Sequence, residues 1–154
     1  MKVRPAKPAD AEGMSIVLQE IIAAWRSDRP CSAEHVRTFY VEHPDRIECS
    51  VAESDKGDIL GFQSLQRATE GNRWGVPPGW GVIGTYVKLG SGRQGLGTAL
   101  FAATKEAARK AKLPSIDATI GEHNDLGLAY YEAMGFRTYR RQPGTISKVY
   151  TVFP

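Results

Sequence analysis

A glycine-rich stretch, Gly90-Ser-Gly-Arg-Gln-Gly-Leu-Gly-Thr98, is the part of this sequence best suited to holding a ligand. A run typical of a β-strand precedes it over residues 82–89, and a run typical of a helix follows it over residues 98–112. Such a turn leaves backbone N–H groups without partners at the helix N-terminus, where the helix dipole also favours negative charge. Glycine lets a ligand approach the backbone and tolerates positive φ. The stretch therefore predicts a site for a phosphate or pyrophosphate group.

The glycines alone leave several interpretations open. They can have a purely structural role in a turn. Alternatively, Gly90, Gly92 and Gly95 match the G-x-G-x-x-G pattern of dinucleotide-binding proteins, and Asp117 follows at about the separation expected of a ribose-binding acid. Against this, Asp117 lies inside its predicted strand, and too little chain follows for a doubly wound sheet. A Walker P-loop is excluded, because no Gly-Lys-Ser/Thr follows the glycines.

The rest of the sequence predicts the elements that position this turn. Apolar residues at helical spacing predict a helix from Pro8 to Trp25, and Ser32 is a suitable N-cap for a second helix that ends near Glu42. A later helix over residues 125–134 is closed by Gly135. Further strands are expected around Val3 and over residues 47–53, 59–67, 115–120, 136–141 and 146–153. The order β-α-α-β-β-β-α-β-α-β-β predicts an α/β (α+β) fold: a mixed, mostly antiparallel sheet of about seven strands with a central βαβ unit and about four helices.

Composition is that of a folded soluble protein. The chain of 154 residues is 42% hydrophobic and 24% charged, which fits a single domain over residues 1–154. A net charge of +3 without a Lys/Arg block predicts no nucleic-acid face, and no apolar run or signal peptide predicts a membrane association. Cys31 and Cys49 lack metal-ligand spacing, so no disulfide scaffold and no metal are expected, and a cytoplasmic location is the simplest one.

A wider frame supports a third interpretation of the turn. Tyr86-Val87 precedes it, Arg93-Gln-Gly-Leu-Gly-Thr98 forms it, and Asn124-Asp-Leu-Gly-Leu-Ala-Tyr-Tyr-Glu-Ala-Met-Gly-Phe136 lies in the next predicted helix. With these motifs, and with Arg4-Pro-Ala-x-x-x-Asp10-Ala near its start, the chain resembles the GCN5-related N-acetyltransferase (GNAT) family over essentially its whole length. Within that family it looks like the small bacterial branch that resembles phosphinothricin and amino-acid N-acetyltransferases.

The resemblance implies acetyl-CoA as the co-substrate, held between the strands over residues 82–89 and 115–120, which are expected to splay apart. Backbone groups near the end of the first strand would pair with the pantetheine arm, and amides of the turn would receive the diphosphate. Asn124 either binds the pantetheine arm or N-caps the following helix. The residues expected to bind the co-substrate are Tyr86, Val87, Arg93, Gln94, Gly95, Leu96, Gly97, Thr98 and Asn124.

The resemblance also implies direct attack of a neutral primary amine on the thioester. The Val87 N–H could stabilise the tetrahedral oxyanion, and Tyr131 is the expected catalytic acid for the leaving thiolate. The alternative for Tyr131 is a core aromatic beside Tyr130. No residue type or spacing identifies the general base, and a water relay is an equal alternative. The candidates for the base are Glu20, Glu70, Asp117, Glu122 and His123.

The acceptor is expected to be a small, amino-acid-like amine. In this fold its pocket is built from the first two helices and the loop before the fourth strand, here residues 24–30 and 67–80. Trp25, Trp74 or Trp80 could form its walls. Arg26, Arg29 or Arg73 could bind a carboxylate. The alternative is that each of these tryptophans packs in the core and each arginine is solvated.

Two other functions compete with an acetyltransferase. One is a catalytically silent acyl-CoA-binding sensor on the same fold, and the other is a nicotinamide-dinucleotide-binding protein, namely a nicotinamide-dependent oxidoreductase. The intact Tyr131 and the intact glycine turn favour the enzyme over the sensor. Many proteins of this fold pair through edge strands, so a homodimer is expected.

Overall fold

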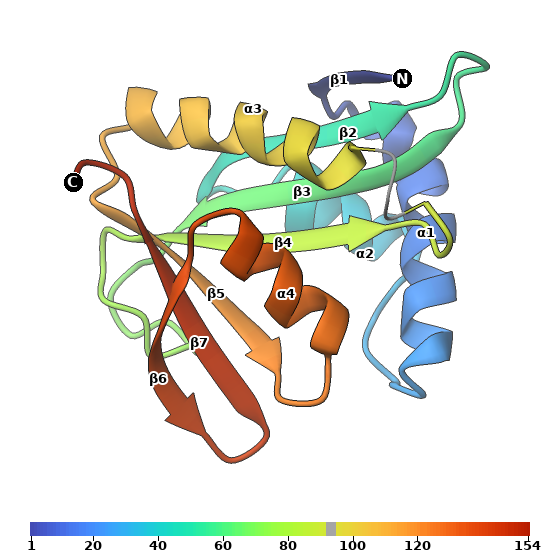
Figure 1. Ribbon diagram of the computed structural model, residues 1–154. Helices are drawn as coiled ribbons and strands as arrows, with labels where there is room; N and C mark the ends of the chain where they lie inside the picture. Colours follow the sequence, from blue (N-terminus) through green and yellow to red (C-terminus); the bar gives the residue numbers. More distant parts are fainter. Residues whose placement is uncertain (92–94) are drawn as a thin grey trace.

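The computed structural model describes residues 1–91 and 95–154, and within them the chain forms four α-helices and seven strands (Figure 1). The helical segments are η1 (Pro8–Asp10), α1 (Ala11–Ala24), α2 (Ala33–Val36), η2 (Arg37–Val41), α3 (Leu96–Lys110) and α4 (Asp125–Ala133). The strands are β1 (Lys2–Pro5), β2 (Arg46–Glu53), β3 (Ile59–Arg67), β4 (Gly81–Val87), β5 (Ser115–Gly121), β6 (Arg137–Gln142) and β7 (Thr145–Thr151). The predicted element order is confirmed.

All seven strands form one mixed sheet in the order β1-β2-β3-β4-β5-β7-β6. Strands β4 and β5 are parallel and are joined by α3, which is the predicted βαβ unit. The other neighbouring strands are antiparallel. The predicted fold class is therefore confirmed, and this topology is not that of the doubly wound sheet that a dinucleotide-binding domain requires.

Helices cover both faces of the sheet (Figure 1). On one face, α1 and the α2–η2 segment bury an apolar cluster that includes Met14, Tyr40, Phe62 and Tyr86. On the other face, α3 and α4 bury apolar residues of β3, β5 and their own inner sides. None of the helices in the described ranges has the length and apolar content that a membrane crossing requires.

The two parallel strands diverge in the middle of the sheet. Strand β4 pairs with β5 only through Gly81 with Ile116 and Val82 with Asp117, although both strands continue for several residues. Their carboxyl ends separate visibly, and α4 lies over the gap (Figure 1). Beyond Val82, the edge of β4 that faces β5 therefore has no strand partner among the described residues, as the resemblance to the GNAT family implied.

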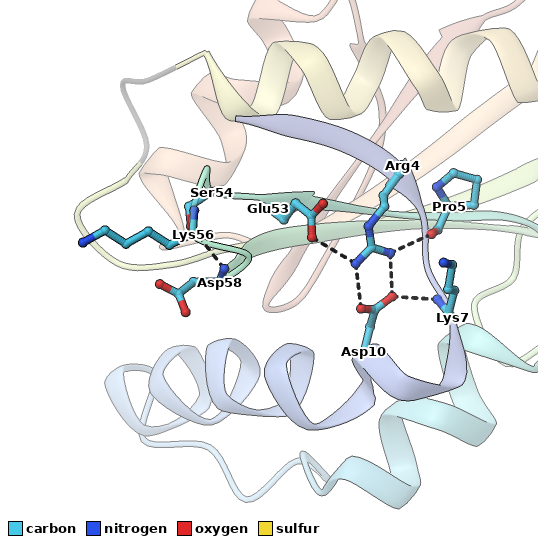
Figure 2. Close-up of polar contacts among 8 residues, drawn as sticks. All are labelled: Arg4, Pro5, Lys7, Asp10, Glu53, Ser54, Lys56 and Asp58. Carbon is cyan, nitrogen blue, oxygen red and sulfur yellow. Dashed lines mark hydrogen bonds and ion pairs between the residues drawn. The ribbon is translucent and has the colours of Figure 1, made fainter.

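An ion-pair cluster fixes the start of the chain on the sheet (Figure 2). Two guanidinium nitrogens of Arg4, on β1, each donate at 2.8 Å to an oxygen of Asp10. One of them also donates to Glu53 on β2 at 3.2 Å. Asp10 in turn accepts a bond from the Lys7 backbone N–H at 2.7 Å, at the start of η1. These two motif residues thus orient α1 relative to β1.

The second helix differs from its prediction. Ser32 is its N-cap, as expected, and accepts from the His35 N–H at 3.1 Å. The α-helix nevertheless ends at Val36, and a π-helical turn continues to Val41, closed by a bond from the Glu42 N–H to the Arg37 carbonyl. Within it, the Thr38 hydroxyl bonds back to preceding carbonyls and competes with the regular ladder. Such wide turns are frequent at functional sites.

Candidate active site

The glycine turn ends in the uncapped N-terminus of α3. Gly95, at φ +76°, is the N-cap residue, and no side chain in the described ranges caps it. A Cβ added at Gly95 would meet no atom of the described residues within 4 Å, so these residues leave the approach to the first turn of α3 clear on that side. Leu96 is buried, whereas Gly95 and Thr98 are exposed. Arg93 and Gln94, also expected to bind the co-substrate, lie outside the described residues.

The edge of β4 presents backbone groups to the gap. The Lys88 N–H donates to the Leu60 carbonyl at 2.8 Å, on the β3 side. Because hydrogen bonding alternates along an antiparallel pair, the N–H groups of Val87 and Thr85 point the other way, toward β5. Tyr86 differs from Val87: its backbone faces β3, and its side chain is buried on the α1 side of the sheet.

Tyr131 of α4 reaches into this gap. Its hydroxyl lies 2.7 Å from Oγ1 of Thr85, a residue on the same strand as Val87. Only 7% of Tyr131 is exposed, and this burial raises the pKa of its hydroxyl well above the ordinary value. Tyr131 therefore keeps its proton at neutral pH, which suits an acid and not a base.

Tyr130 occupies a different position from its neighbour. Its hydroxyl donates to the Gly97 carbonyl at 2.7 Å and accepts from Nε2 of Gln63 at 3.0 Å. Burial raises the pKa of Tyr130 to about 12. A Cβ added at Gly97 would lie 2.5 Å from the Tyr130 ring, so only glycine fits there. Tyr130 therefore braces the glycine turn.

Sequence-based prediction missed three polar residues beneath the gap, of which Thr85 is half-buried and the other two are buried. Gln63 of β3, Thr85 of β4 and Thr104 of α3 are joined by hydrogen bonds, and Gln63 is fully buried. No family motif contains them. A glutamine within the mostly apolar strand pattern of residues 59–67 is the signal that could have indicated a buried polar network.

Asn124 is the N-cap of α4. Its Oδ1 accepts a hydrogen bond from the Gly127 N–H at 3.0 Å. This is the capping geometry that the sequence allowed for it. The position of α4 over the gap, and with it that of Tyr131, depends on this helix start.

A small hollow lies against the opposite side of β4. Gly84 and Tyr86, which alternate with Thr85 along the strand, contribute to its wall. The hollow is lined by Arg29, Phe39, Tyr40, Ser64, Gln66, Arg73, Trp74, Val82, Ile83, Gly84 and Tyr86. The acceptor pocket was expected on the segments that carry Arg29, Arg73 and Trp74, and the structure brings these three residues together.

Two arginines make the hollow electropositive. Arg29 donates to the Tyr86 hydroxyl at 3.3 Å. The Arg73 guanidinium lies 5.2 Å from the Phe39 ring centre and 5.1 Å from that of Trp74. Neither arginine forms an ion pair with a carboxylate in the part of the chain that the structure describes. Partial burial and these two cations lower the pKa of His35, which stacks on Phe39.

Other proposed pocket residues lie elsewhere. Trp80 packs against Tyr139, with ring centres 5.5 Å apart, and does not line the hollow. Trp25 is 47% exposed and does not line the hollow, although the Arg29 guanidinium lies 5.9 Å from its ring centre. Arg26 is exposed at the end of α1, with a φ of 52°.

The candidate bases also differ in their surroundings. Glu122 and His123 pair with each other in solvent, and Glu70 is exposed. Asp117 is fully buried, and burial raises its pKa although it accepts bonds from Tyr139 and Thr119. Glu20, on α1, has one buried carboxylate oxygen without a hydrogen-bond partner among the described residues. No group of side chains in the described ranges could hold a metal ion.

A family model for the acetyltransferase (GNAT) family matches residues 15–136. Because this match covers well over half of the chain, the chain belongs to the acetyltransferase (GNAT) family. The resemblance seen in the sequence motifs is thereby confirmed. No curated protein matches the chain.

Solved structures share the fold over almost the whole chain. A candidate phosphinothricin N-acetyltransferase is 18% identical with a TM-score of 0.78, and 99% of each chain is covered. YncA from Salmonella typhimurium, solved with its cofactor acetyl-CoA, is 18% identical with a TM-score of 0.79 over 99% of this chain and 94% of that one. The ribosomal-protein-alanine N-acetyltransferase from Brucella melitensis is 20% identical with a TM-score of 0.79 over 98% and 99%. The names of the first and third specify different acceptors, so the fold does not determine the acceptor.

Proposed function

We propose that this chain transfers the acetyl group of acetyl-CoA to the primary amine of a small, amino-acid-like acceptor. The observation that carries this proposal is the position of the Tyr131 hydroxyl. It is buried and protonated at the gap between β4 and β5, and the neighbouring Tyr130 bonds to Gly97 in the first turn of α3. A hollow with two arginines lies across β4 from it. The proposed acid, the proposed diphosphate site at the first turn of α3 (called the cradle below) and the proposed acceptor pocket thus all lie near β4.

The described residues fit acetyl-CoA. The first turn of α3, Leu96 to Thr98, offers a helix N-terminus without a side-chain cap, which suits a diphosphate. None of the described residues occupies the space that a side chain at Gly95 would take. The outward-facing edge of β4 near Val87 can hydrogen-bond an extended amide chain in the manner of an added strand.

Val87 and Tyr131 have separate roles in the proposed acetyl transfer. Acetyl-CoA supplies an acetyl thioester. The neutral amine nitrogen forms a bond to the thioester carbonyl carbon, and the bond from this carbon to sulfur breaks. The Val87 N–H stabilises the oxyanion. The Tyr131 hydroxyl gives its proton to the departing sulfur and is reprotonated from solvent. The amine gives up its proton to water or to a neighbouring base.

The hollow favours an acceptor that carries a carboxylate. Arg29 and Arg73 are two cations without a carboxylate partner among the described residues, and an arginine fork matches a carboxylate. Aromatic rings of Phe39, Tyr40 and Trp74 line the same hollow and suit the apolar part of a small molecule. A cationic polyamine would instead be repelled.

A CoA-release assay tests this function. The purified protein is supplied with acetyl-CoA and with a panel of amino acids, each paired with the amine that lacks its carboxylate. We expect release of CoA with members of the first group and weak or no release with their decarboxylated counterparts. Release that is equal for both groups would contradict the carboxylate assignment, and absence of release from any primary amine would contradict the transferase.

We further propose a homodimer. The support is that β1 and β6 each end the sheet with one backbone edge that pairs with no other strand of the described chain. The mass in solution, measured by analytical ultracentrifugation, is expected to be twice that of the chain. A single species of monomer mass at micromolar concentrations would contradict the dimer.

A further inference from the structure

A continuous hydrogen-bond chain connects the glycine turn with Tyr131. It runs from the Gly97 carbonyl to the Tyr130 hydroxyl, and from there to Nε2 of Gln63. The same Nε2 contacts Oγ1 of Thr85 at 3.0 Å, and Thr85 contacts the Tyr131 hydroxyl at 2.7 Å. The chain crosses from α3 through α4 and β3 to β4, and so it joins the two parts of the proposed site.

The direction of this chain is fixed by its first member. A carbonyl oxygen only accepts hydrogen bonds, so the Tyr130 hydroxyl must donate its proton to Gly97. The Tyr130 oxygen is then left to accept from Gln63, which places the NH₂ group, and not the carbonyl, of Gln63 on that side. Thr104 agrees with this orientation, because its hydroxyl donates to Oε1 of Gln63 at 2.5 Å.

The orientation of the Gln63 amide makes Thr85 a hydrogen-bond acceptor on that side. The second Nε2 proton of Gln63 is directed at Oγ1 of Thr85, so this oxygen accepts and the Thr85 proton must go elsewhere. Thr85 and Tyr131 share one hydrogen bond, yet each carries a hydroxyl proton. Within the described residues, one of these two protons therefore has no acceptor. A buried donor without an acceptor is unfavourable and is satisfied by a group that enters the gap.

We infer that Gln63 and Thr85 are positioning residues for Tyr131, which direct its hydroxyl proton into the gap toward the sulfur of CoA. This inference rests on the proposed function. When Thr85 donates to the Tyr131 oxygen, the Tyr131 proton is the one left over, and the sulfur supplies its acceptor. The Gly97 carbonyl thus sets the direction of every hydrogen bond from the first turn of α3 to Tyr131. The glycine turn proposed to bind the diphosphate therefore also orients the proton donor.

Binding of CoA and of desulfo-CoA, which lacks the sulfur, tests this inference without turnover. Both affinities are measured by calorimetry above the pKa of the free thiol. We expect the wild-type protein to prefer CoA by roughly tenfold to a hundredfold, the range of a hydrogen bond to a charged group. In Thr85→Val this preference should disappear, while the affinity for desulfo-CoA stays within about twofold. Thr85→Ser keeps the hydroxyl and should restore the preference.

Thr119→Val is the matched control. Thr119 lies on β5, and its hydroxyl bonds to Asp117 and Ser147, outside the chain of bonds described above. It should leave the preference for CoA unchanged. Thr85→Ala also lacks the hydroxyl and creates no new contact, so it replaces Thr85→Val if circular dichroism shows that the valine variant is unfolded.

The outcomes separate this inference from the proposed function. If wild type binds acetyl-CoA but binds CoA and desulfo-CoA equally, no proton is directed at the sulfur and the inference is wrong. The inference is equally wrong if folded Thr85→Val or Thr85→Ala keeps the preference. If wild type binds neither CoA nor acetyl-CoA, the proposed function itself fails.

Discussion

The hydroxyl of Tyr130 donates a hydrogen bond of 2.7 Å to the carbonyl oxygen of Gly97, and the Tyr130 ring occupies the space where a side chain at residue 97 would lie. This contact ties the helix that carries the proposed acid to the first turn of α3. The distance between the diphosphate cradle and Tyr131 is therefore fixed by packing, and a change on either side should affect the other.

Gly97→Ala tests this relationship. The added Cβ would lie 2.5 Å from the Tyr130 ring and must displace it, at a cost of about 1–3 kcal/mol in the free energy of unfolding. The displaced ring also opens the cradle, so the affinity for acetyl-CoA should fall at least about tenfold. Gly121→Ala is the matched control, because a Cβ there meets no atom within 4 Å. Unchanged affinity in Gly97→Ala would show that the tyrosine does not brace the turn.

Tyr131→Phe should lower kcat without weakening the binding of acetyl-CoA. The phenol is the proposed proton donor, and loss of a general acid costs roughly a hundredfold to ten-thousandfold in rate. The ring remains, so packing against Phe136 is preserved. Steady-state kinetics and calorimetry on the same preparation separate the two quantities. A kcat equal to that of wild type would assign Tyr131 to the core alone.

The two arginines of the hollow should control acceptor binding. Arg73→Gln removes the charge but keeps a polar side chain near Phe39 and Trp74. The KM for a carboxylate-bearing acceptor should rise roughly tenfold or more, because a charge-assisted hydrogen bond is lost. The KM for acetyl-CoA should not change. Arg141→Gln, on exposed β6, is the control. Equal KM values in wild type and Arg73→Gln would exclude Arg73 from the acceptor site.

The Arg4–Asp10 pair should make stability depend on pH in the acid range. Hydrogen bonds from Arg4 hold the pKa of Asp10 below its ordinary value of 3.8. Because the folded state binds the proton more weakly than the unfolded state, the pair's contribution is present above pH 3.8 and is lost as the pH falls through the lowered pKa.

Asp10→Asn measures that contribution. It should reduce the free energy of unfolding at neutral pH by about 1–3 kcal/mol and flatten its decline in acid. Urea unfolding at a series of pH values gives both quantities. Asp58→Asn provides the comparison, because Asp58 is exposed at the nearby β2–β3 turn (Figure 2). If the two variants lose stability equally, the Arg4–Asp10 pair makes no specific contribution to the free energy of unfolding.

The sequence predicted the fold well because its signals are local. Glycine turns, caps such as Ser32 and Asn124, and the alternation of apolar residues are set by backbone geometry within a few residues. The exception is the second helix, where a π-helical turn over Arg37–Val41 replaces regular helix. The hydroxyl of Thr38, which competes for helix carbonyls, is a signal too weak to predict that change.

The site was predicted only where a motif contains its residues. Tyr131 and the turn belong to motifs, and the comparison of Tyr130 with Tyr131 rested on register alone. Gln63 and Thr85 lie on neighbouring strands, and their contact with α4 depends on tertiary packing across the sheet. Spacing in a single sequence cannot show such a contact. The sequence placed the segments of Arg29 and Arg73 at one acceptor pocket, but only the fold shows that Arg26 of the same segment lies outside it.

Calorimetric titration with acetyl-CoA, with NAD as the comparison, tests whether this chain binds the co-substrate of an acetyltransferase. The uncapped N-terminus of α3, the clear space at Gly95 and the splayed strands predict binding of acetyl-CoA in the micromolar range and no binding of NAD. Binding of NAD with no binding of acetyl-CoA would contradict the account. It would return the glycine turn to the dinucleotide interpretation that its sequence alone allowed.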